Sequence, residues 1–483
     1  MIIVHFGSPY ALKYFDDFDW VIQANDEDPI AQDVAAQAIF GAIAIKGRLP
    51  ITASPKSRFN TGLITNELYR LGYAYPESVG LKSDTLSQID SLIAAAIKEK
   101  ATPGAVVLVA KDGKIIYEKS FGTHTYGDVQ GTSVSDIFDV ASVTKIAAST
   151  ISVMKLHEEG KISIHQPIRN YLPQVAGTDK ADLKLYDIMA HRAGLKAWIP
   201  FYQQTLTEVP KGEGVADSYY SRRQSEVFSV KITDQLYLKK DFQDSIWSQI
   251  YKSELSPTQG YVYSDLGFYL AGKIVEAQTG LRVDQYANKT FYSPLGLQTT
   301  GYNPLEKFDK LRVVPSEEDR YWRNQKVQGY VHDMGAAMLN GVSGHAGLFS
   351  SAKDLAVIMQ MLLNMGYYGG KQYLNPATIH TFTTRHANDT RRGIGFDMLD
   401  LSPDKEPNIS NKVSKRAFGH YGFTGTGVWA DPEHNLIYIF LSNRTYPSMN
   451  NNKLSTSNYR PRVQTVIYNA LEQDTLEEVG ARQ

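Results

Sequence analysis

Within residues 76–480, segments with the pattern of β-strands lie near both ends. A mostly helical segment separates these two groups of predicted strands. The turn Lys111-Asp112-Gly113 joins the two early strands into a hairpin. The predicted strands are 105–110, 114–121, 393–398, 416–421, 426–430 and 436–442. Because strands must pair to satisfy their backbone groups, this order predicts one sheet, split between 76–140 and 390–480, with a helical insertion over about 155–370.

Residues 1–75 differ from this pattern and are predicted to form a small partial α/β segment. Its expected elements are strands 2–6, 20–23 and 49–53 and helix 32–45. Breaks rich in Pro, Gly and Ser over 54–82 place a domain boundary near 75–80. Beyond it, helices are expected over 85–99, 143–158 and 467–471.

The composition excludes several classes of protein. With 42% hydrophobic residues, the chain of 483 residues can bury a large core. A net charge of −1 gives no electrostatic basis for binding nucleic acid, and no apolar run is long enough for a membrane span. The absence of cysteine excludes thiol nucleophiles and thiolate metal sites. The first residues lack the basic start of an export signal.

Ser142 and Lys145 form an S-x-x-K tetrad at the start of the predicted helix 143–158. Residues three apart share a helix face, so the lysine amine can lie beside the serine hydroxyl. Backbone N–H groups at a helix start favour a developing anion. The tetrad therefore predicts that Ser142 is a nucleophile.

Two further motifs follow in the chain, Tyr263-Ser264-Asp265 and His420-Tyr421-Gly422. The order S-x-x-K, Y-x-N, K/H-x-G is typical of the serine penicillin-recognising enzymes. Over about 76–480 the chain resembles that superfamily, nearest to class C β-lactamases, D-alanyl-D-alanine carboxypeptidases and β-lactamase-like esterases. The resemblance implies an α/β (α+β) fold, in which an antiparallel sheet flanked by helices joins an all-helical subdomain.

The resemblance also implies roles for single residues. Ser142 would accept the acyl group, with help from Lys145, and the Lys145 cation would bias Tyr263 toward a phenolate that relays protons. The backbone N–H groups of Ser142 and Phe423 would form the oxyanion hole. Gly422 would let the strand edge approach the substrate.

Two positions depart from the family pattern. Asp265 stands where the family usually has an asparagine, and an ionised carboxylate cannot donate a hydrogen bond to substrate. Asp265 would also hold a proton on Lys145, or it could cap the following helix. Tyr421 replaces a threonine that can contact a substrate carboxylate. His420, in the position of a lysine, would contact that carboxylate as a titratable cation.

Other histidines fit structural roles better. His191 and His345 lie in glycine-flanked turns, and Ser343 is expected to be a loop residue because its surroundings fall one residue short of G-x-S-x-G. The eleven histidines show no paired metal-binding spacing, so neither a metal nor another cofactor is expected.

The N-terminal segment has its own resemblance. The strings Val4-His-Phe-Gly-Ser-Pro-Tyr and Lys46-Gly-Arg-Leu-Pro-Ile-Thr are similar to the C-terminal end of glycoside hydrolase family 3 β-N-acetylglucosaminidases. The catalytic barrel of that family is absent from the chain, so glycosidase activity is not expected. This resemblance implies a parent protein that acts on cell-wall fragments in the periplasm.

Together these observations predict a serine hydrolase that acts through an acyl-enzyme on Ser142. The expected substrate is a small molecule or peptide, namely a D-amino-acid peptide, amide or ester related to peptidoglycan. A carboxylesterase of the same fold and a non-catalytic peptidoglycan-binding module remain alternatives.

Overall fold

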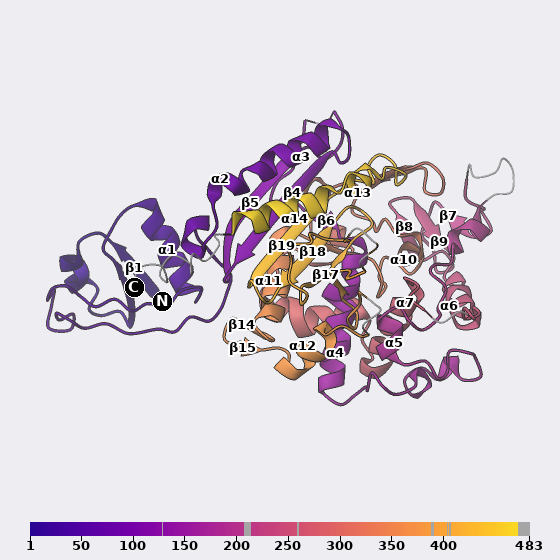
Figure 1. The fold of residues 1–483 in the computed structure, drawn as a ribbon, viewed down its shortest axis with the longest axis horizontal. Coiled ribbons are helices and arrows are strands. Elements are labelled where there is room, and N and C mark those ends of the chain that lie inside the picture. The colour runs from indigo at the N-terminus through magenta and orange to yellow at the C-terminus, as the bar shows by residue number, and fades with distance from the viewer. Residues whose placement is uncertain are drawn as a thin grey trace.

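The structure is a computed structural model that describes residues 1–127, 129–206, 214–257, 260–387, 391–402, 404 and 407–471. Its centre is a seven-stranded sheet with the strand order β16-β17-β18-β19-β4-β5-β3 (Figure 1). The strands are β3 (Gly72–Tyr73), β4 (Gly104–Lys111), β5 (Lys114–Gly122), β16 (Asp397–Met398), β17 (Phe418–Tyr421), β18 (Gly427–Asp431) and β19 (Leu436–Ser442). Neighbouring strands are antiparallel, except that β3 runs parallel to β5.

The pairing of β4 with β19 joins the early and late parts of the chain. Their antiparallel register runs from Leu436 opposite Lys111 to Ser442 opposite Ala105. The predicted split sheet is therefore confirmed. The predicted strand 393–398 is too long, because only Asp397–Met398 pairs with β17.

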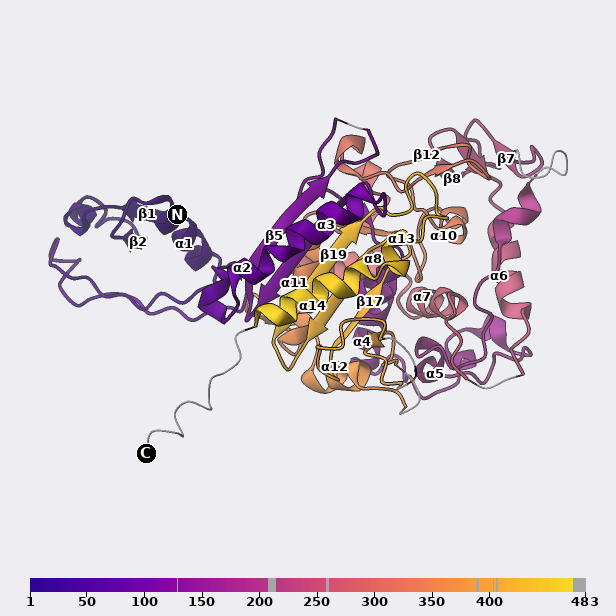
Figure 2. The same cartoon turned by 45° about the horizontal axis from the view of Figure 1, so that its top comes forward.

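Side chains along the central strands alternate between two buried cores. Val106 and Leu108 of β4 belong to one apolar cluster, and Val107 and Val109 belong to the other. This alternation follows from the two-residue period of a strand, and both faces are apolar because helices cover both. Helices α2 (Ser83–Leu86), α3 (Gln88–Lys98) and α14 (Tyr459–Ala470) cover one face, and α11 (Ala352–Leu363) packs on the other (Figure 2).

The region between the two halves of the sheet contains helices and short strands. Its helices are α4 (Ile151–Glu158), α5 (Leu185–Met189), α6 (Phe242–Lys252), α7 (Leu266–Thr279), α8 (Val283–Ala287), α9 (Ser293–Leu295), α10 (Met334–Met338) and α12 (Pro376–Thr383). Its strands are β7 (Tyr220–Ser221), β8 (Val230–Thr233), β9 (Leu236–Leu238), β10 (Gly301–Tyr302), β11 (Glu317–Asp319), β12 (Gln325–Val327), β13 (Leu348–Ser350), β14 (Tyr367–Tyr368) and β15 (Lys371–Gln372). The expectation of an all-helical subdomain is therefore wrong. Strands this short do not show a two-residue period in the sequence.

The N-terminal segment forms a small unit beside the main sheet (Figure 1). Strands β1 (Ile2–Phe6) and β2 (Trp20–Ala24) pair in parallel, and α1 (Pro29–Ile39) follows. Residues 49–53 form no strand, and the helix ends earlier than predicted. The main sheet begins with β3 at Gly72, slightly before the predicted boundary. Among the described residues, no helix is long and apolar enough to cross a membrane.

Candidate active site

Ser142 lies in a tight turn between the strand β6 (Phe138–Asp139) and a long helical stretch. A 3₁₀ turn, Ala141–Val143, is followed by the π-helical Lys145–Thr150 and then by α4. The turn requires a positive φ of 47° at Ala141. The Asp139 carboxylate holds it by accepting a hydrogen bond from the Ala141 N–H at 2.8 Å. The predicted helix 143–158 is thus helical throughout, and Ser142 lies at its start.

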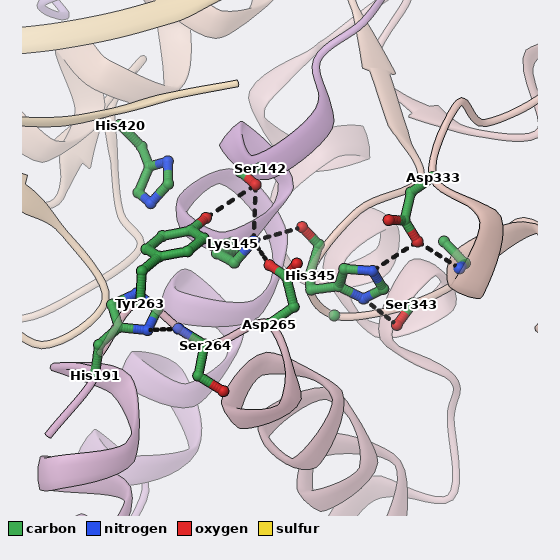
Figure 3. A network of polar contacts seen from close by, with 12 residues as sticks. Ser142, Lys145, His191, Tyr263, Ser264, Asp265, Asp333, Ser343, His345 and His420 are labelled. Atoms are coloured by element: carbon green, nitrogen blue, oxygen red, sulfur yellow. Dashed lines mark hydrogen bonds and ion pairs between the residues drawn. The ribbon is translucent and has the colours of Figure 1, made fainter. Parts of the chain in front are cut away.

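Lys145 is fully buried and contacts three oxygens around Ser142 (Figure 3). Its Nζ donates to Ser142 Oγ at 2.8 Å and to the carbonyl of His345 at 3.1 Å. The Asp265 carboxylate lies 2.7 Å from the same nitrogen. Burial by itself would lower the pKa of Lys145, but the Asp265 carboxylate and Tyr263 raise it above its usual value. Lys145 is therefore an ammonium at rest, as Asp265 led us to expect.

Tyr263 is the second group in contact with the nucleophile. Its hydroxyl donates to Ser142 Oγ at 3.0 Å, and its ring packs 4.5 Å from that of His191. Burial raises the pKa of Tyr263, and the charge of Lys145 only partly offsets this effect. The expected bias toward a phenolate is therefore wrong, because burial outweighs the effect of the Lys145 cation on the pKa of Tyr263, and the Asp265 carboxylate raises that pKa further. Tyr263 rests as a phenol.

Asp265 occupies the N-cap position of α7 but does not cap that helix. No side-chain capping bond is formed, and the carboxylate turns toward Lys145 instead. Of the two roles considered for Asp265, the structure shows the ion pair.

His420 projects from β17 toward Tyr263, with ring centroids 6.0 Å apart. Its Nδ1 donates to the carbonyl of Tyr421 at 2.6 Å, and its buried Nε2 has no hydrogen-bond partner among the described residues. Burial, followed by the charges of Arg392 and Lys145, lowers the pKa of His420 well below its usual value. His420 is therefore a neutral acceptor, and the expectation of a cationic anchor is wrong.

The neighbours of His420 in the β17–β18 hairpin make contacts that the sequence motif did not predict. Tyr421 turns to the opposite face, where it packs on Trp429 with ring centroids 5.3 Å apart. A Cβ at Gly422 would lie 2.1 Å from Thr426 Oγ1 and 2.5 Å from the carbonyl of Val140. Gly422 thus allows the hairpin to approach the Ser142 turn, and it also lines the pocket described below. The backbone N–H of Phe423 donates to no other described residue, which leaves it free for the predicted oxyanion hole.

Sequence reasoning missed two supporting roles. His191 Nδ1 accepts a hydrogen bond from the Ser264 N–H at 3.0 Å, which fixes the loop carrying Tyr263. His345 Nδ1 accepts a hydrogen bond from Ser343 Oγ, and His345 Nε2 donates one to Asp333, each at 2.8 Å (Figure 3). These two bonds fix His345, so that its carbonyl oxygen stays in contact with Lys145. Both histidines are structural, as predicted, but each positions a residue of the site. No short motif encodes contacts between such distant segments.

These groups line a pocket of about 730 Å³ at the edge of the sheet. The residues of the pocket are Ala141, Ser142, Trp198, Tyr202, Tyr261, Tyr263, Asp265, His332, Asp333, Met334, His345, Ala346, Arg391, Arg392, Asp397, His420, Tyr421, Gly422, Phe423, Arg444, Met449, Ser455 and Arg460. Every predicted site residue except Lys145, which lies beneath Ser142, therefore lines this one cavity.

The neutrality of His420 leads to an expected pH dependence. KM for an anionic ester should stay flat from about pH 5.5 to about pH 8.5, as for a neutral ester, because the ring carries no charge in that range. The unfolded chain takes up a proton near about pH 6.5 and the folded site does not, so the free energy of unfolding should fall below that pH. Steady-state kinetics measure KM, and thermal melts in the same series of buffers measure the change in stability. A KM that rises through neutrality only for the anionic ester would show a charged His420.

The comparisons with known proteins agree with this geometry. Residues 89–457 match the model of the β-lactamase family, and the chain belongs to that family. It is 30% identical over 397 residues to a protein of Escherichia coli K12 named "Putative D-alanyl-D-alanine carboxypeptidase", covering 77% of this chain and 85% of that protein. The match to glycoside hydrolase family 3 proposed for residues 1–75 stays a prediction, since the family match begins later.

Solved structures show the same fold at low sequence identity. A class C β-lactamase from Rhodobacter sphaeroides aligns with a TM-score of 0.52 and 18% identity, covering 79% of this chain and 99% of that one. EstCE1, described as a hydrolase with promiscuous acyltransferase activity, aligns with a TM-score of 0.55 and 17% identity, covering 80% and 99%. The chain is thus a serine hydrolase of the β-lactamase fold.

Proposed function

We propose that Ser142 is acylated by substrate and that water then hydrolyses the acyl-enzyme. The observation that carries this proposal is the position of Ser142 Oγ, between Lys145 Nζ at 2.8 Å and the Tyr263 hydroxyl at 3.0 Å on a pocket wall. A serine held by two donors beside a free backbone N–H can form an ester while its charge is stabilised.

The resting protonation states favour a concerted proton transfer. This transfer requires the Tyr263 O–H, which donates to Ser142 Oγ at rest, to turn toward the leaving group when substrate binds. As Ser142 Oγ then attacks the carbonyl carbon, its proton passes to the Tyr263 oxygen, and the phenol proton of Tyr263 passes to the leaving group. The ammonium of Lys145 keeps its proton and stabilises the serine oxygen. No free phenolate or neutral lysine is needed, which fits the raised pKa of both groups.

The proposed substrate is a peptide, amide or ester of a D-amino acid related to peptidoglycan. The name of the Escherichia coli relative supports this class. The periplasm, where peptidoglycan is exposed, is the compartment that fits this substrate. Residues 1–75 would then correspond to the C-terminal end of a family 3 glycosidase domain.

A carboxylesterase is the second candidate, and Asp265 favours it. The carboxylate contacts Lys145 and offers the substrate no N–H, whereas the asparagine usual in the family can donate one. An ester needs less recognition of this kind than a peptide or β-lactam.

This difference predicts a substrate preference. The wild-type protein should hydrolyse a p-nitrophenyl ester faster than it turns over a chromogenic cephalosporin. Asp265→Asn should shift the ratio toward the cephalosporin by up to about tenfold, because the asparagine N–H adds a hydrogen bond to the substrate. Initial rates of both substrates on both proteins check this. A wild-type protein that prefers the cephalosporin would contradict it.

Intact-mass spectrometry tests the function itself. A fluorophosphonate should add one mass increment to the wild-type protein and none to Ser142→Ala, and a penicillin should do the same if D-amino-acid peptides are substrates. Adducts with the fluorophosphonate alone would favour the esterase. Absence of both adducts would favour the non-catalytic peptidoglycan-binding module.

A further inference from the structure

Among the described residues, three carboxylates line the active-site pocket, and two of them are paired with cations. Asp265 lies 2.7 Å from Lys145 Nζ, and Asp397 lies 3.6 Å from Arg392 Nε. The third is Asp333, which forms no ion pair with a lysine or arginine in the described part of the chain. Asp333 therefore brings a carboxylate to the pocket wall that no lysine or arginine neutralises.

One oxygen of Asp333 holds the local structure, and the other is available to a ligand. Oδ1 accepts hydrogen bonds from the Ala336 N–H at 2.7 Å, as the N-cap of α10, and from His345 Nε2 at 2.8 Å. No described residue donates to Oδ2, and Figure 3 shows this oxygen on the side of the carboxylate that faces Ser142. The side chain is 23% exposed, so a molecule in the pocket can reach Oδ2.

The carboxyl group of Asp333 is ionised at neutral pH. Burial alone would raise its pKa, but His345 and the Ala336 N–H lower the pKa of Asp333 below its usual value. The adjacent His332 does not turn to Oδ2, because its Nε2 lies 3.1 Å from the Glu317 carboxylate. Oδ2 is therefore a fixed anionic acceptor with unused hydrogen-bonding capacity.

Aromatic rings lie beside Asp333 on the pocket wall. The 3₁₀ helix Phe201–Thr205 packs against α10, and its Tyr202 lines the pocket together with Trp198. The two ring centroids are 6.5 Å apart, and Trp198 is 42% exposed. The face of an aromatic ring attracts an ammonium group. A free carboxylate oxygen next to aromatic rings thus favours a cationic ligand.

The position of Asp333 indicates which part of a substrate it meets. Figure 3 shows Asp333 and Tyr263 on opposite sides of Ser142. In the proposed mechanism Tyr263 gives its proton to the leaving group, so the leaving group must lie beside the Tyr263 hydroxyl. A group that reaches Asp333 therefore belongs to the acyl part of the substrate.

We propose that Asp333 binds an ammonium group on the acyl part of the substrate that acylates Ser142. The substrate class is then an ester or amide of an acid that carries a free amine, and the smallest example is an aminoacyl ester. This inference rests on the proposed function and specifies one part of its substrate. Asp333 selects the substrate and takes no part in proton transfer.

Two pairs of p-nitrophenyl esters test this role, and within each pair an ammonium replaces a methyl group of the acyl chain. The short pair is the D-alanyl and isobutyryl esters, and the long pair is the 6-aminohexanoyl and heptanoyl esters. For each ester, kcat/KM is divided by the rate constant of spontaneous hydrolysis, which corrects for intrinsic reactivity. The wild-type protein should prefer the ammonium member of at least one pair.

Asp333→Asn is the matched variant. Because Oδ1 accepts both structural hydrogen bonds, the amide oxygen of asparagine can keep them while an NH₂ group replaces Oδ2. The change should lower the preference for the ammonium member by about tenfold, since it removes a charge-assisted hydrogen bond. Asp28→Asn, at the exposed N-cap of α1 outside the pocket, should keep the wild-type preference.

Two results would overturn the ammonium subsite. One is a wild-type protein that prefers the ammonium member of neither pair, a result that does not depend on how any variant folds. The other is an unchanged preference in an Asp333→Asn protein that thermal melts show to be folded. Hydrolysis of the neutral esters by the wild-type protein but not by Ser142→Ala would leave the proposed function intact in either case.

Discussion

Replacement of Ser142 by alanine is expected to lower kcat/KM for an activated ester by at least about a thousandfold. Lys145 Nζ and the Tyr263 hydroxyl both contact the Ser142 hydroxyl oxygen, at 2.8 Å and 3.0 Å. Its removal leaves no group in that position to form the acyl-enzyme. Steady-state hydrolysis of a p-nitrophenyl ester measures the loss.

Ser135→Ala is the matched control, because Ser135 is exposed and lies outside the pocket. It should keep the wild-type rate. Retention of more than a few per cent of activity by a folded Ser142→Ala protein would show that another residue is the nucleophile. Ser343, which contacts His345 at 2.8 Å, would be the next residue to test.

Lys145→Met is expected to lose about as much activity as Ser142→Ala, and also stability. Ser142 and Lys145 act as one unit, so the activity of the double variant Ser142→Ala/Lys145→Met should be little lower than that of either single variant. The change also leaves the Asp265 carboxylate without its cation, and loss of one partner of a buried pair costs about 3 kcal/mol. Chemical denaturation measures the free energy of unfolding alongside the ester assay.

The variant Lys145→Met/Asp265→Leu separates the two effects. It removes both charges, so stability should largely return while activity does not. If the double variant recovers hydrolysis, Lys145 serves only to neutralise Asp265. If Lys145→Met alone keeps the wild-type stability, Asp265 is not paired in solution.

Local sequence patterns were sufficient for the central strands and for Ser142. The Lys111-Asp112-Gly113 turn and the alternating strands beside it predict β4 and β5 to within a residue or two, because the relevant contacts are close in sequence. The tetrad places Ser142 and Lys145 on one helix face for the same reason, and Nζ lies 2.8 Å from Oγ.

Burial decided the properties that the sequence predicted wrongly. His420 was expected to carry a charge on the basis of its ordinary pKa, and Tyr263 was expected to be biased toward a phenolate by the Lys145 cation. Both are enclosed, and loss of water disfavours the charged form of each. The close approach of Gly422 to Thr426 and Val140 is likewise a tertiary contact that no local pattern contains.

The sequence by itself determined the order of the elements, the nucleophilic tetrad and the identity of the three motif segments, since each depends on residues close together in the chain. Only the tertiary structure decided which charges are paired. In the structure, Asp265 forms an ion pair with Lys145, and Asp397 forms one with Arg392. Arg444 and Arg460 form no ion pair among the described residues. The physical reason is that the strength of a charge interaction depends on distance and solvent exposure, which are set when the two halves of the sheet pair.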